Sequence, residues 1–406
     1  MKPLRLLSLL ILCCLSCTGE KVPQVVREDL FILEIGMLED QIALFDLDGR
    51  RGANASIAMR EGLFYISSGG GGKVSRYSSY GDLIFMIYNE ETNPPPLTLR
   101  SNIGEDEVVT RWAFSWPLRE PGRIAVDSRK HIYVEDTLPY ERHGFDAEKK
   151  ALLDRMILHF DDTGRFIEYL GQEGVGGTPF PRISGIYTSL QDELAVVCRL
   201  PEGWMIYWFD SAANPLFVIP LPDSGVPVPE DRSGVFSSVD AIMAAPDARR
   251  LFMKVDYYRV LNDEGTATRA GVAPDSSVVW ILNAETGVYS GMMEAPFYEH
   301  AGQSGGPGRR EMERLFYSML GVMRGGRVFL QVPVEGGYSV LILEAGGAGE
   351  DAGARRQGII RVDEDELEFN TFNLSGDGIL SGLLATAYEA RMVWWRTDRL
   401  IAGLLR

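Results

Sequence analysis

The chain has 406 residues and a formal net charge of −17 at pH 7, with 57 acidic against 40 basic side chains. This acidic balance argues against nucleic-acid binding, because contacts with phosphate groups require a basic surface. The same charge opposes adsorption to anionic lipid. With 45% hydrophobic residues, 44 Gly and 21 Pro, the composition is that of a globular protein rich in turns.

Residues 1–16 have the pattern of a secretory signal peptide. Two basic residues precede an apolar run from Leu6 that is too short for a transmembrane helix, which needs about 20 apolar residues. The chain becomes polar immediately after Cys17. We therefore expect cleavage before Cys17, a tether over residues 17–28 and one folded domain over residues 29–404.

The segment Leu15-Ser16-Cys17 resembles the cleavage motif of bacterial lipoproteins, in the relaxed form found in spirochaetes. The resemblance implies that Cys17 carries lipid on its sulfur and anchors the protein at the cell envelope, on the periplasmic or the surface side. The usual motif has two small residues before the cysteine, whereas here Leu15 and Cys14 take the second and third positions before the cut. Cys14 is the alternative lipidation site, and an ordinary signal peptide with apolar cysteines is the simpler alternative.

Cys198 is the last of the four cysteines in the sequence. If Cys17 is lipidated and the signal is removed, Cys198 is the single free thiol of the mature chain, so an internal disulfide is excluded. It lies in the apolar run LAVVCRL, which favours a small core residue over a nucleophile.

Beyond residue 28 the apolar residues come in runs of about four to eight, separated by Gly, Asp, Asn and Pro, as in strands joined by turns. Helical periodicity is confined to EKKALLDRM at 148–156 and REMERLFYSML at 310–320. The chain is therefore predicted to be all-β.

A unit of four strands recurs along the chain. It is clearest in GRIAVDSRKHIYVEDT with RMILHFDDTGRFIEYLG, and it returns in GIYTSLQDELAVVCRLPEGWMIYWFDSAANPLFVIPL. Phe160-Asp161 of the first copy and Phe209-Asp210 of the second are 49 residues apart, close to the ~40–50 residues of a four-stranded blade. The unit resembles the NHL-type blade of a β-propeller, in which radially packed sheets cover one another's faces.

Five blades fit between residue 52 and about residue 374, the last of them ending in the strand ELEFNTFNL at 366–374. A sixth blade is predicted to pair the C-terminal segment 378–401 with the N-terminal segments 29–36 and 41–49, which closes the ring and removes two exposed sheet edges. The predicted fold is a six-bladed β-propeller closed by its N- and C-terminal strands. A seven-bladed count fits the same pattern.

Long insertions interrupt the blades, notably residues 91–121 and 345–358, and the glycine and charge of the second predict a mobile loop. Loops on a rigid ring are where binding usually resides. In the first insertion, Trp112, Phe114 and Trp116 lie on one side of an extended segment and are candidate partner-binding residues. The alternative is that these rings plug the propeller's face or pack on a neighbouring blade.

Two glycine-rich motifs suggest catalysis but depart from the patterns that catalysis needs. GQSGG at 302–306 would make Ser304 a nucleophile, yet all four histidines precede it, whereas the histidine of α/β-hydrolases follows its serine. SSGGGGKVS at 67–75 lacks the first Gly and the final Ser or Thr of a Walker loop, so a hairpin turn explains it better.

Acidic residues near strand ends are candidate ligands for a cation in the central channel, as some six-bladed propeller hydrolases have. The candidates are Asp127, Glu135, Asp136 and Asp240, although such residues are more often turn formers. No spacing distinguishes a metal-binding set. DLDG at 46–49 lacks the later ligands of a calcium loop, and the sequence contains no zinc motif.

These observations predict a lipid-anchored propeller of the cell envelope that has no catalytic activity and no cofactor. We expect its acidic, loop-bearing faces to bind another envelope protein, as a scaffold does. The alternative is a small-molecule or glycan site in the channel, with metal-dependent hydrolysis as its chemistry.

Overall fold

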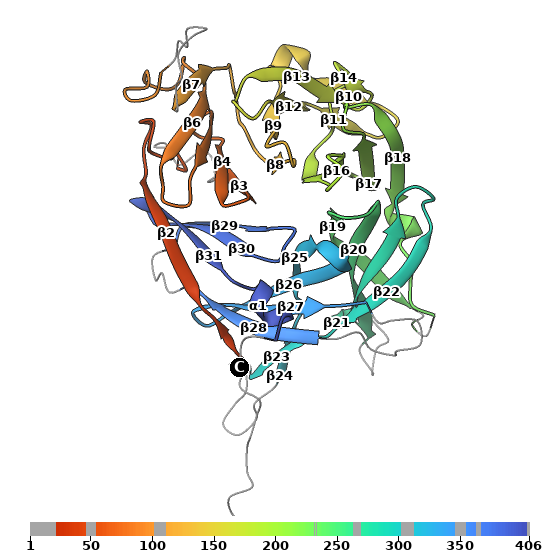
Figure 1. The fold of residues 1–406 in the computed structure, drawn as a ribbon. Coiled ribbons are helices and arrows are strands. Elements are labelled where there is room, and N and C mark those ends of the chain that lie inside the picture. The colour runs from red at the N-terminus through yellow and green to blue at the C-terminus, as the bar shows by residue number, and fades with distance from the viewer. Residues whose placement is uncertain are drawn as a thin grey trace, which may run out of the picture.

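The structure is a computed structural model that describes residues 22–45, 54–100, 111–230, 232, 234–262, 269–301, 312–345, 355–362 and 367–403. Six sheets of four or five strands stand radially around a central axis (Figure 1). The protein is therefore an all-β propeller of six blades, as predicted. Four residues, Asp398–Ile401, form its single α-helix in the described ranges, α1.

Blade 1 is antiparallel except for its outermost strand, β7, which runs parallel to β6. Its strands are β3 (Ala55–Arg60), β4 (Leu63–Ser68), β5 (Lys73–Tyr77), β6 (Leu83–Tyr88) and β7 (Trp112–Ser115). The glycines between β4 and β5 form a hairpin turn, as predicted for the run at 67–75.

Blade 2 carries a small inserted hairpin between its second and third strands. The blade contains β8 (Ile124–Val126), β9 (Ile132–Thr137), β12 (Arg155–Phe160), β13 (Phe166–Gly171) and β14 (Gly174–Val175), and the hairpin contains β10 (Gly144–Asp146) and β11 (Ala151–Leu153). The helix expected over 148–156 is wrong. Ala151 and Leu153 are buried while Leu152 is exposed, which is the two-residue period of a strand.

Blades 3 and 4 are four-stranded. Blade 3 contains β15 (Ile183–Thr188), β16 (Leu194–Leu200), β17 (Gly203–Phe209) and β18 (Pro215–Pro222), and blade 4 contains β19 (Val235–Ala244), β20 (Arg250–Asn262), β21 (Arg269–Asn283) and β22 (Tyr289–Ala295). A separate hairpin follows blade 4 and pairs β23 (Tyr298–Ala301) with β24 (Met312–Leu315). The helix expected over 310–320 is therefore also wrong, because cross-strand pairing outweighs its helical pattern.

Blades 5 and 6 join the two ends of the chain. Blade 5 contains β25 (Ser318–Met323), β26 (Arg327–Val334), β27 (Gly337–Leu343), β28 (Arg355–Arg361) and the parallel β1 (Gln24–Val25), and blade 6 contains β29 (Phe369–Leu374), β30 (Leu380–Ala385), β31 (Glu389–Trp395) and β2 (Arg27–Glu34). In Figure 1 the N-terminal β2 lies along the C-terminal β31, and Phe31 is paired with Met392. The N- and C-terminal strands thus close the ring, as predicted.

Four boundaries differ from the sequence prediction. The strand predicted at 366–374 is represented by β29, the innermost strand of blade 6, and β28, which begins in the insertion expected to be a mobile loop, is the fourth strand of blade 5. The segment 41–49 adds no strand within its described part, where Ile42 makes only an isolated bridge to Ile35. Strands β1 and β2 also begin inside residues 17–28, which were expected to be a tether.

The repeated Asp before the fourth strand has a local structural reason. Asp161 Oδ1 accepts hydrogen bonds from the backbone N–H groups of Thr163 and Arg165, both at 2.9 Å, and Gly164 has a φ of +86°. Asp210 holds the equivalent turn of blade 3 through the N–H groups of residues 212 and 214. The Asp carboxylate accepts hydrogen bonds from backbone N–H groups that have no backbone acceptor in the tight turn.

Hydrophobic clusters fill the seams between neighbouring blades. Cys198 is fully buried in the cluster that joins blades 2 and 3, and burial raises the pKa of its thiol, so it is the core residue that the sequence predicts. In the described part of the chain, no helix has the length and apolar character needed to cross a membrane.

Candidate functional site

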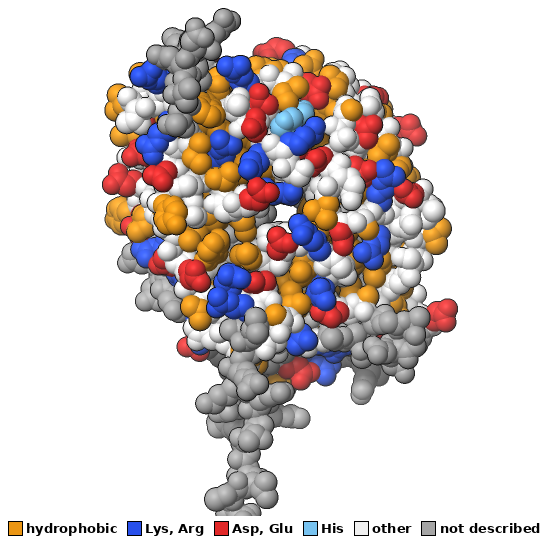
Figure 2. All heavy atoms as spheres, in the orientation of Figure 1, with side chains coloured by type: hydrophobic (Ala, Val, Ile, Leu, Met, Phe, Trp, Pro, Cys, Tyr) orange, Lys and Arg blue, Asp and Glu red, His pale blue; other side chains and the backbone are white. Residues whose placement is uncertain are grey.

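The innermost strands of all six blades line one cavity of about 490 Å³ at the centre of the ring. Its walls come from β3, β8, β15, β19, β25 and β29, for example through Ala58, Val126, Ala244 and Val322. Figure 2 shows an opening at the centre of the ring, bordered by both basic and acidic side chains. The volume lies within the range of about 300–1,000 Å³ that is usual for ligand sites.

Hydrogen bonds between innermost strands fix the geometry of this channel. Thr188 Oγ1 donates to the carbonyl of Val126 at 2.8 Å, which joins blades 3 and 2. The backbone N–H of Met59 donates to Asn373 Oδ1 at 3.2 Å, which joins blades 1 and 6 across the closure. The channel wall is therefore cross-linked between blades, so side chains carried on it have defined positions.

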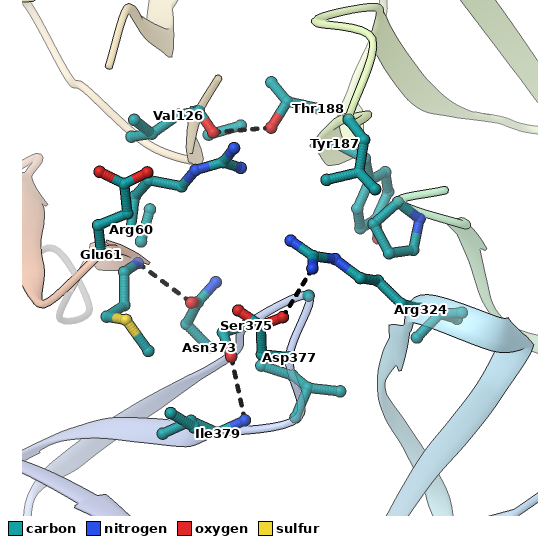
Figure 3. A pocket seen from close by; sticks show the side chains of 18 of the residues that line it. Arg60, Glu61, Val126, Tyr187, Thr188, Arg324, Asn373, Ser375, Asp377 and Ile379 are labelled. Atoms are coloured by element: carbon teal, nitrogen blue, oxygen red, sulfur yellow. Dashed lines mark hydrogen bonds and ion pairs between the residues drawn. The ribbon is translucent and has the colours of Figure 1, made fainter. Parts of the chain in front are cut away.

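One mouth of the channel is charged, because the ends of the innermost strands and the turns that follow them place Arg60, Glu61, Arg324 and Asp377 there (Figure 3). Arg324 Nη1 lies 3.0 Å from Asp377 Oδ1. Glu61 Oε2 lies 3.2 Å from Lys130 Nζ. The polar groups of the mouth thus come from blades 1, 2, 5 and 6.

Arg60 is half-buried, and its side chain has no hydrogen-bond or ion-pair partner within the residues that the structure describes. Figure 3 shows its side chain reaching across the mouth toward Val126 and Thr188. On the facing wall, burial raises the pKa of Tyr187 to about 12, so its hydroxyl stays protonated and donates to the carbonyl of Ile242 at 3.4 Å. The site therefore offers a free guanidinium over a partly apolar channel, which suits binding by charge and hydrogen bonds.

Each of the candidate metal ligands makes its own structural contacts, and the four do not form one group. Asp127 Oδ1 accepts the backbone N–H of His131 at 2.8 Å, and Asp136 accepts those of Arg119, Glu120 and Thr137, so both hold turns. Burial raises the pKa of Asp136.

Asp127 is also paired with Arg129, at 2.8 Å, and the other two candidates each have a cationic partner. Glu135 lies 3.4 Å from Arg123, and Asp240, two blades away, lies 3.6 Å from Lys254. The described ranges contain no group of three or more His, Cys, Asp or Glu side chains that could hold a metal ion.

The candidate aromatic residues lie in the outer seam between blades 1 and 2. Trp112 stacks on Phe85 with ring centroids 6.4 Å apart, and its indole N–H donates to the carbonyl of Thr163. Trp116 stacks on Phe166 with centroids 3.8 Å apart. Phe114 lies in the same strand β7, with Arg165 over its ring. These contacts agree with the alternative that the rings pack on a neighbouring blade. Partner binding by the three rings stays a prediction.

Three expectations from the sequence lie outside the described residues. They are lipidation of Cys17, with its alternative Cys14, the glycine-rich loop around Ser304 and the DLDG segment at 46–49.

The mouth residues Arg60, Arg324, Asn373 and Asp377 do not stand out in the sequence. A usable signal exists, because Arg60 ends an innermost strand just before the turn Glu61-Gly62, and Ser375-Gly376-Asp377-Gly378 follows another innermost strand directly. Aligning the blades on their first strands, instead of on the third-strand Asp, would have placed these charges around one opening.

No protein-family profile and no curated protein matches this chain. Its structure is similar to the β-propeller domain of the Trilobed protease from Pyrococcus furiosus, at 12% identity and a TM-score of 0.38, covering 84% of this chain and 93% of that one. It is also similar to an ulvan lyase of a polysaccharide lyase family, at 12% identity and a TM-score of 0.39, with coverage of 91% and 83%. A putative gluconolactonase has 10% identity and a TM-score of 0.38, with 94% of each chain covered. The activities in these names belong to those proteins.

Proposed function

We propose that the protein is a non-catalytic binding protein of the cell envelope, anchored through lipidated Cys17, and that it binds a partner protein at the charged mouth of its channel. The observation that carries the proposal is the convergence of side chains from blades 1, 5 and 6 on one opening, with the Arg60 guanidinium free to accept a ligand. A binding site built on innermost strands that are hydrogen-bonded between blades loses little entropy when it engages a partner.

The proposed absence of catalysis is supported by the chemistry of the channel wall. Among the described residues that line the cavity there is no His and no Cys. The tyrosine on the wall has a raised pKa, which disfavours it as a base. Acidic residues at the mouth are engaged in ion pairs at 3.0 and 3.2 Å, so they are already neutralised within the protein.

The anchor is tested by intact mass and detergent partitioning of the protein from its native host, beside a Cys17→Ala variant. A mass increment of lipid size that is absent in the variant, together with loss of partitioning into detergent, would support the anchor. An unmodified N-terminus, or partitioning that the substitution leaves unchanged, would overturn it. Cys14→Ala is the matched control, because it removes the alternative site and is expected to leave the increment in place.

The binding site is tested by photo-crosslinking in the native host, with a benzophenone amino acid at one of two positions in blade 3. Leu190 lines the channel mouth and is 36% exposed, whereas Val218 lies on the outer strand β18 and is 49% exposed. We expect a specific adduct from position 190 and none from position 218. Adducts only from position 218 would move the binding surface to the outer rim, and this part of the proposal would fail.

A further inference from the structure

The position of Arg60 is set by the tight turn between β3 and β4. Arg60 pairs with Leu63 across this turn, and the two central residues, Glu61 and Gly62, have φ values of +52° and +75°. Two successive positive φ values are those of a type I′ turn, which fits the twist of the two strands. Because the turn is short and regular, the backbone of Arg60 has a defined position, from which its side chain extends into the channel mouth.

Two further donors reach the same opening, one from the adjacent blade 6 and one from blade 5. The guanidinium of Arg324 points into the mouth, where one of its nitrogens is paired with Asp377. Asn373 uses its Oδ1 to accept the N–H of Met59, which leaves its amide nitrogen on the side of the cavity (Figure 3). Three side chains from blades 1, 5 and 6 therefore present N–H groups to the same space.

The four charged side chains that line the mouth, two Arg, one Glu and one Asp, sum to no net charge. Asp377 pairs with Arg324, and Glu61 pairs with Lys130, which lies outside the lining, so the Arg60 side chain is left without an ion-pair partner among the described residues. This guanidinium is available on a chain whose formal charge is −17. A guanidinium binds carboxylate and phosphate through the same planar fork, but one unpaired guanidinium matches a monoanion better than a dianion.

We propose that the channel mouth binds a carboxylate attached to an apolar group, and that its occupant is the C-terminal residue of a partner protein. Arg60 would bind the carboxylate, with Arg324 and Asn373 as further donors. This inference rests on the proposed function and names the part of the partner that is recognised.

The wall below the charged rim accepts the apolar part of such a ligand. Ala58, Ile124, Val126, Ile186 and Val322 line the cavity and come from four different blades. A cavity of about 490 Å³ has room for a terminal residue and its neighbour, not for a folded domain. Capture of a chain end by a cationic site beside an apolar pocket combines a charged anchor with burial of apolar surface.

The test is calorimetric titration of the purified protein with three small probes. N-acetyl-leucine carries the carboxylate of a chain end, N-acetyl-leucinamide has the same shape without the charge, and octanoate is a free acid without a peptide group. We expect N-acetyl-leucine to bind with a millimolar dissociation constant, as its size allows, and the amide to bind at least about tenfold more weakly. Octanoate binding alone would reassign the site to a free acid and overturn the chain-end proposal.

Variants of Arg60 connect the binding to the mouth. Arg60→Gln is expected to abolish N-acetyl-leucine binding, and Arg60→Lys to restore part of it, because the charge returns without the planar fork. Arg356→Gln is the matched control, since Arg356 is exposed on β28 of blade 5, away from the residues that line the cavity. Equal binding of acid and amide, equal binding by Arg60→Gln and the wild type, or no binding of N-acetyl-leucine would each overturn the proposal.

The photo-crosslinking experiment separates this inference from the proposed function. If the adduct at position 190 persists in the Arg60→Gln variant, the mouth binds a partner but carboxylate recognition fails. If no adduct forms at position 190 in the wild type, the proposed function itself fails.

Discussion

The Nδ1 atom of His131 lies 3.0 Å from the Nε2 atom of His159, and the Nδ1 atom of His159 lies 3.1 Å from Glu168 Oε1. Since an ionised carboxylate only accepts, His159 donates to Glu168, and neutral His159 then accepts from Nδ1–H of His131. His159 is 6% exposed, and Tyr133 stacks on it with ring centroids 4.4 Å apart. A second proton on His159 would place two N–H groups against each other.

Because of these hydrogen bonds between His131, His159 and Glu168, the free energy of unfolding is expected to fall as the pH drops below neutrality. Burial, helped by His131, lowers the pKa of His159 below its ordinary value of 6.5 even though Glu168 opposes the shift. The folded chain therefore binds this proton less readily than the unfolded chain. The contribution to the free energy of unfolding is present above pH 6.5 and is lost as the pH falls through the folded-state pKa.

Denaturant unfolding at pH 8 and pH 5 checks this, with His159→Gln beside the wild type. We expect the free energy of unfolding to fall less between the two pH values in the variant, because its position 159 does not titrate. His143→Gln is the control, since His143 contacts only the Leu138 carbonyl and the exposed Tyr140 among described partners and should leave the slope unchanged. Equal slopes for wild type and His159→Gln would contradict the prediction.

Ring closure depends on the inward side chains of β2. Phe31 is 9% exposed and packs on Phe64 and Tyr77 of blade 1, with ring centroids 5.9 and 5.3 Å apart. Phe31→Ala is expected to lower the free energy of unfolding by about 3–5 kcal/mol, because it leaves a cavity in the seam between blades 6 and 1. The next residue, Ile32, is 51% exposed on the other face, and Ile32→Ala should change stability by no more than about 0.5 kcal/mol. Similar losses in both variants, measured by denaturant unfolding, would mean that the strand itself, not this seam, limits closure.

Lys73 connects blade 1 to the segment after β2. Its ammonium is almost fully buried and donates to the carbonyls of Met37, Leu38 and Gln41 at 3.3, 2.7 and 2.8 Å. Burial lowers its pKa to about 8, so the group stays charged at neutral pH. Lys73→Met should cost about 1–3 kcal/mol of unfolding free energy, because the carbonyls lose a buried donor.

A surface lysine provides the comparison for Lys73. Lys150 pairs with Glu202 at 2.7 Å, but both side chains are mostly exposed. Lys150→Met should have no measurable effect on the unfolding midpoint, since exposed pairs contribute little. A Lys73→Met variant as stable as Lys150→Met would show that the segment 37–41 does not need the lysine.

Cys198 should resist thiol reagents in the folded protein. It is fully buried, and burial raises the pKa of its thiol, so neither access nor the reactive thiolate is available. In protein that begins at Thr18, maleimide should label Cys198 no faster than the chain unfolds. A Val218→Cys variant provides the control, because residue 218 is 49% exposed and should react at once. Rapid labelling at position 198 would reveal local opening between blades 2 and 3.

The sequence by itself determined the fold class and the closure of the ring. Runs with a two-residue period bounded by turn residues require strands, and the repeated aromatic-Asp pair, Phe160-Asp161 and Phe209-Asp210, marks the end of the third strand of a blade. The role of Cys198 and the turn at 67–75 also follow from local pattern. Strand patterns, the role of Cys198 and the turn depend on residues that are close in the chain, whereas closure pairs segments at its two ends and was predicted by counting blades.

Only the tertiary structure decided which strand belongs to which blade and where the charges meet. Residues 366–374 and 355–361 are both acceptable strands, and their assignment to blades 6 and 5 depends on pairing with partners distant in sequence. Arg60 and Arg324 are 264 positions apart in the sequence, yet the ring brings both to one opening. A radial fold makes neighbours of equivalent positions in separate blades. A pattern of residues close in the sequence does not encode how near such positions lie in space.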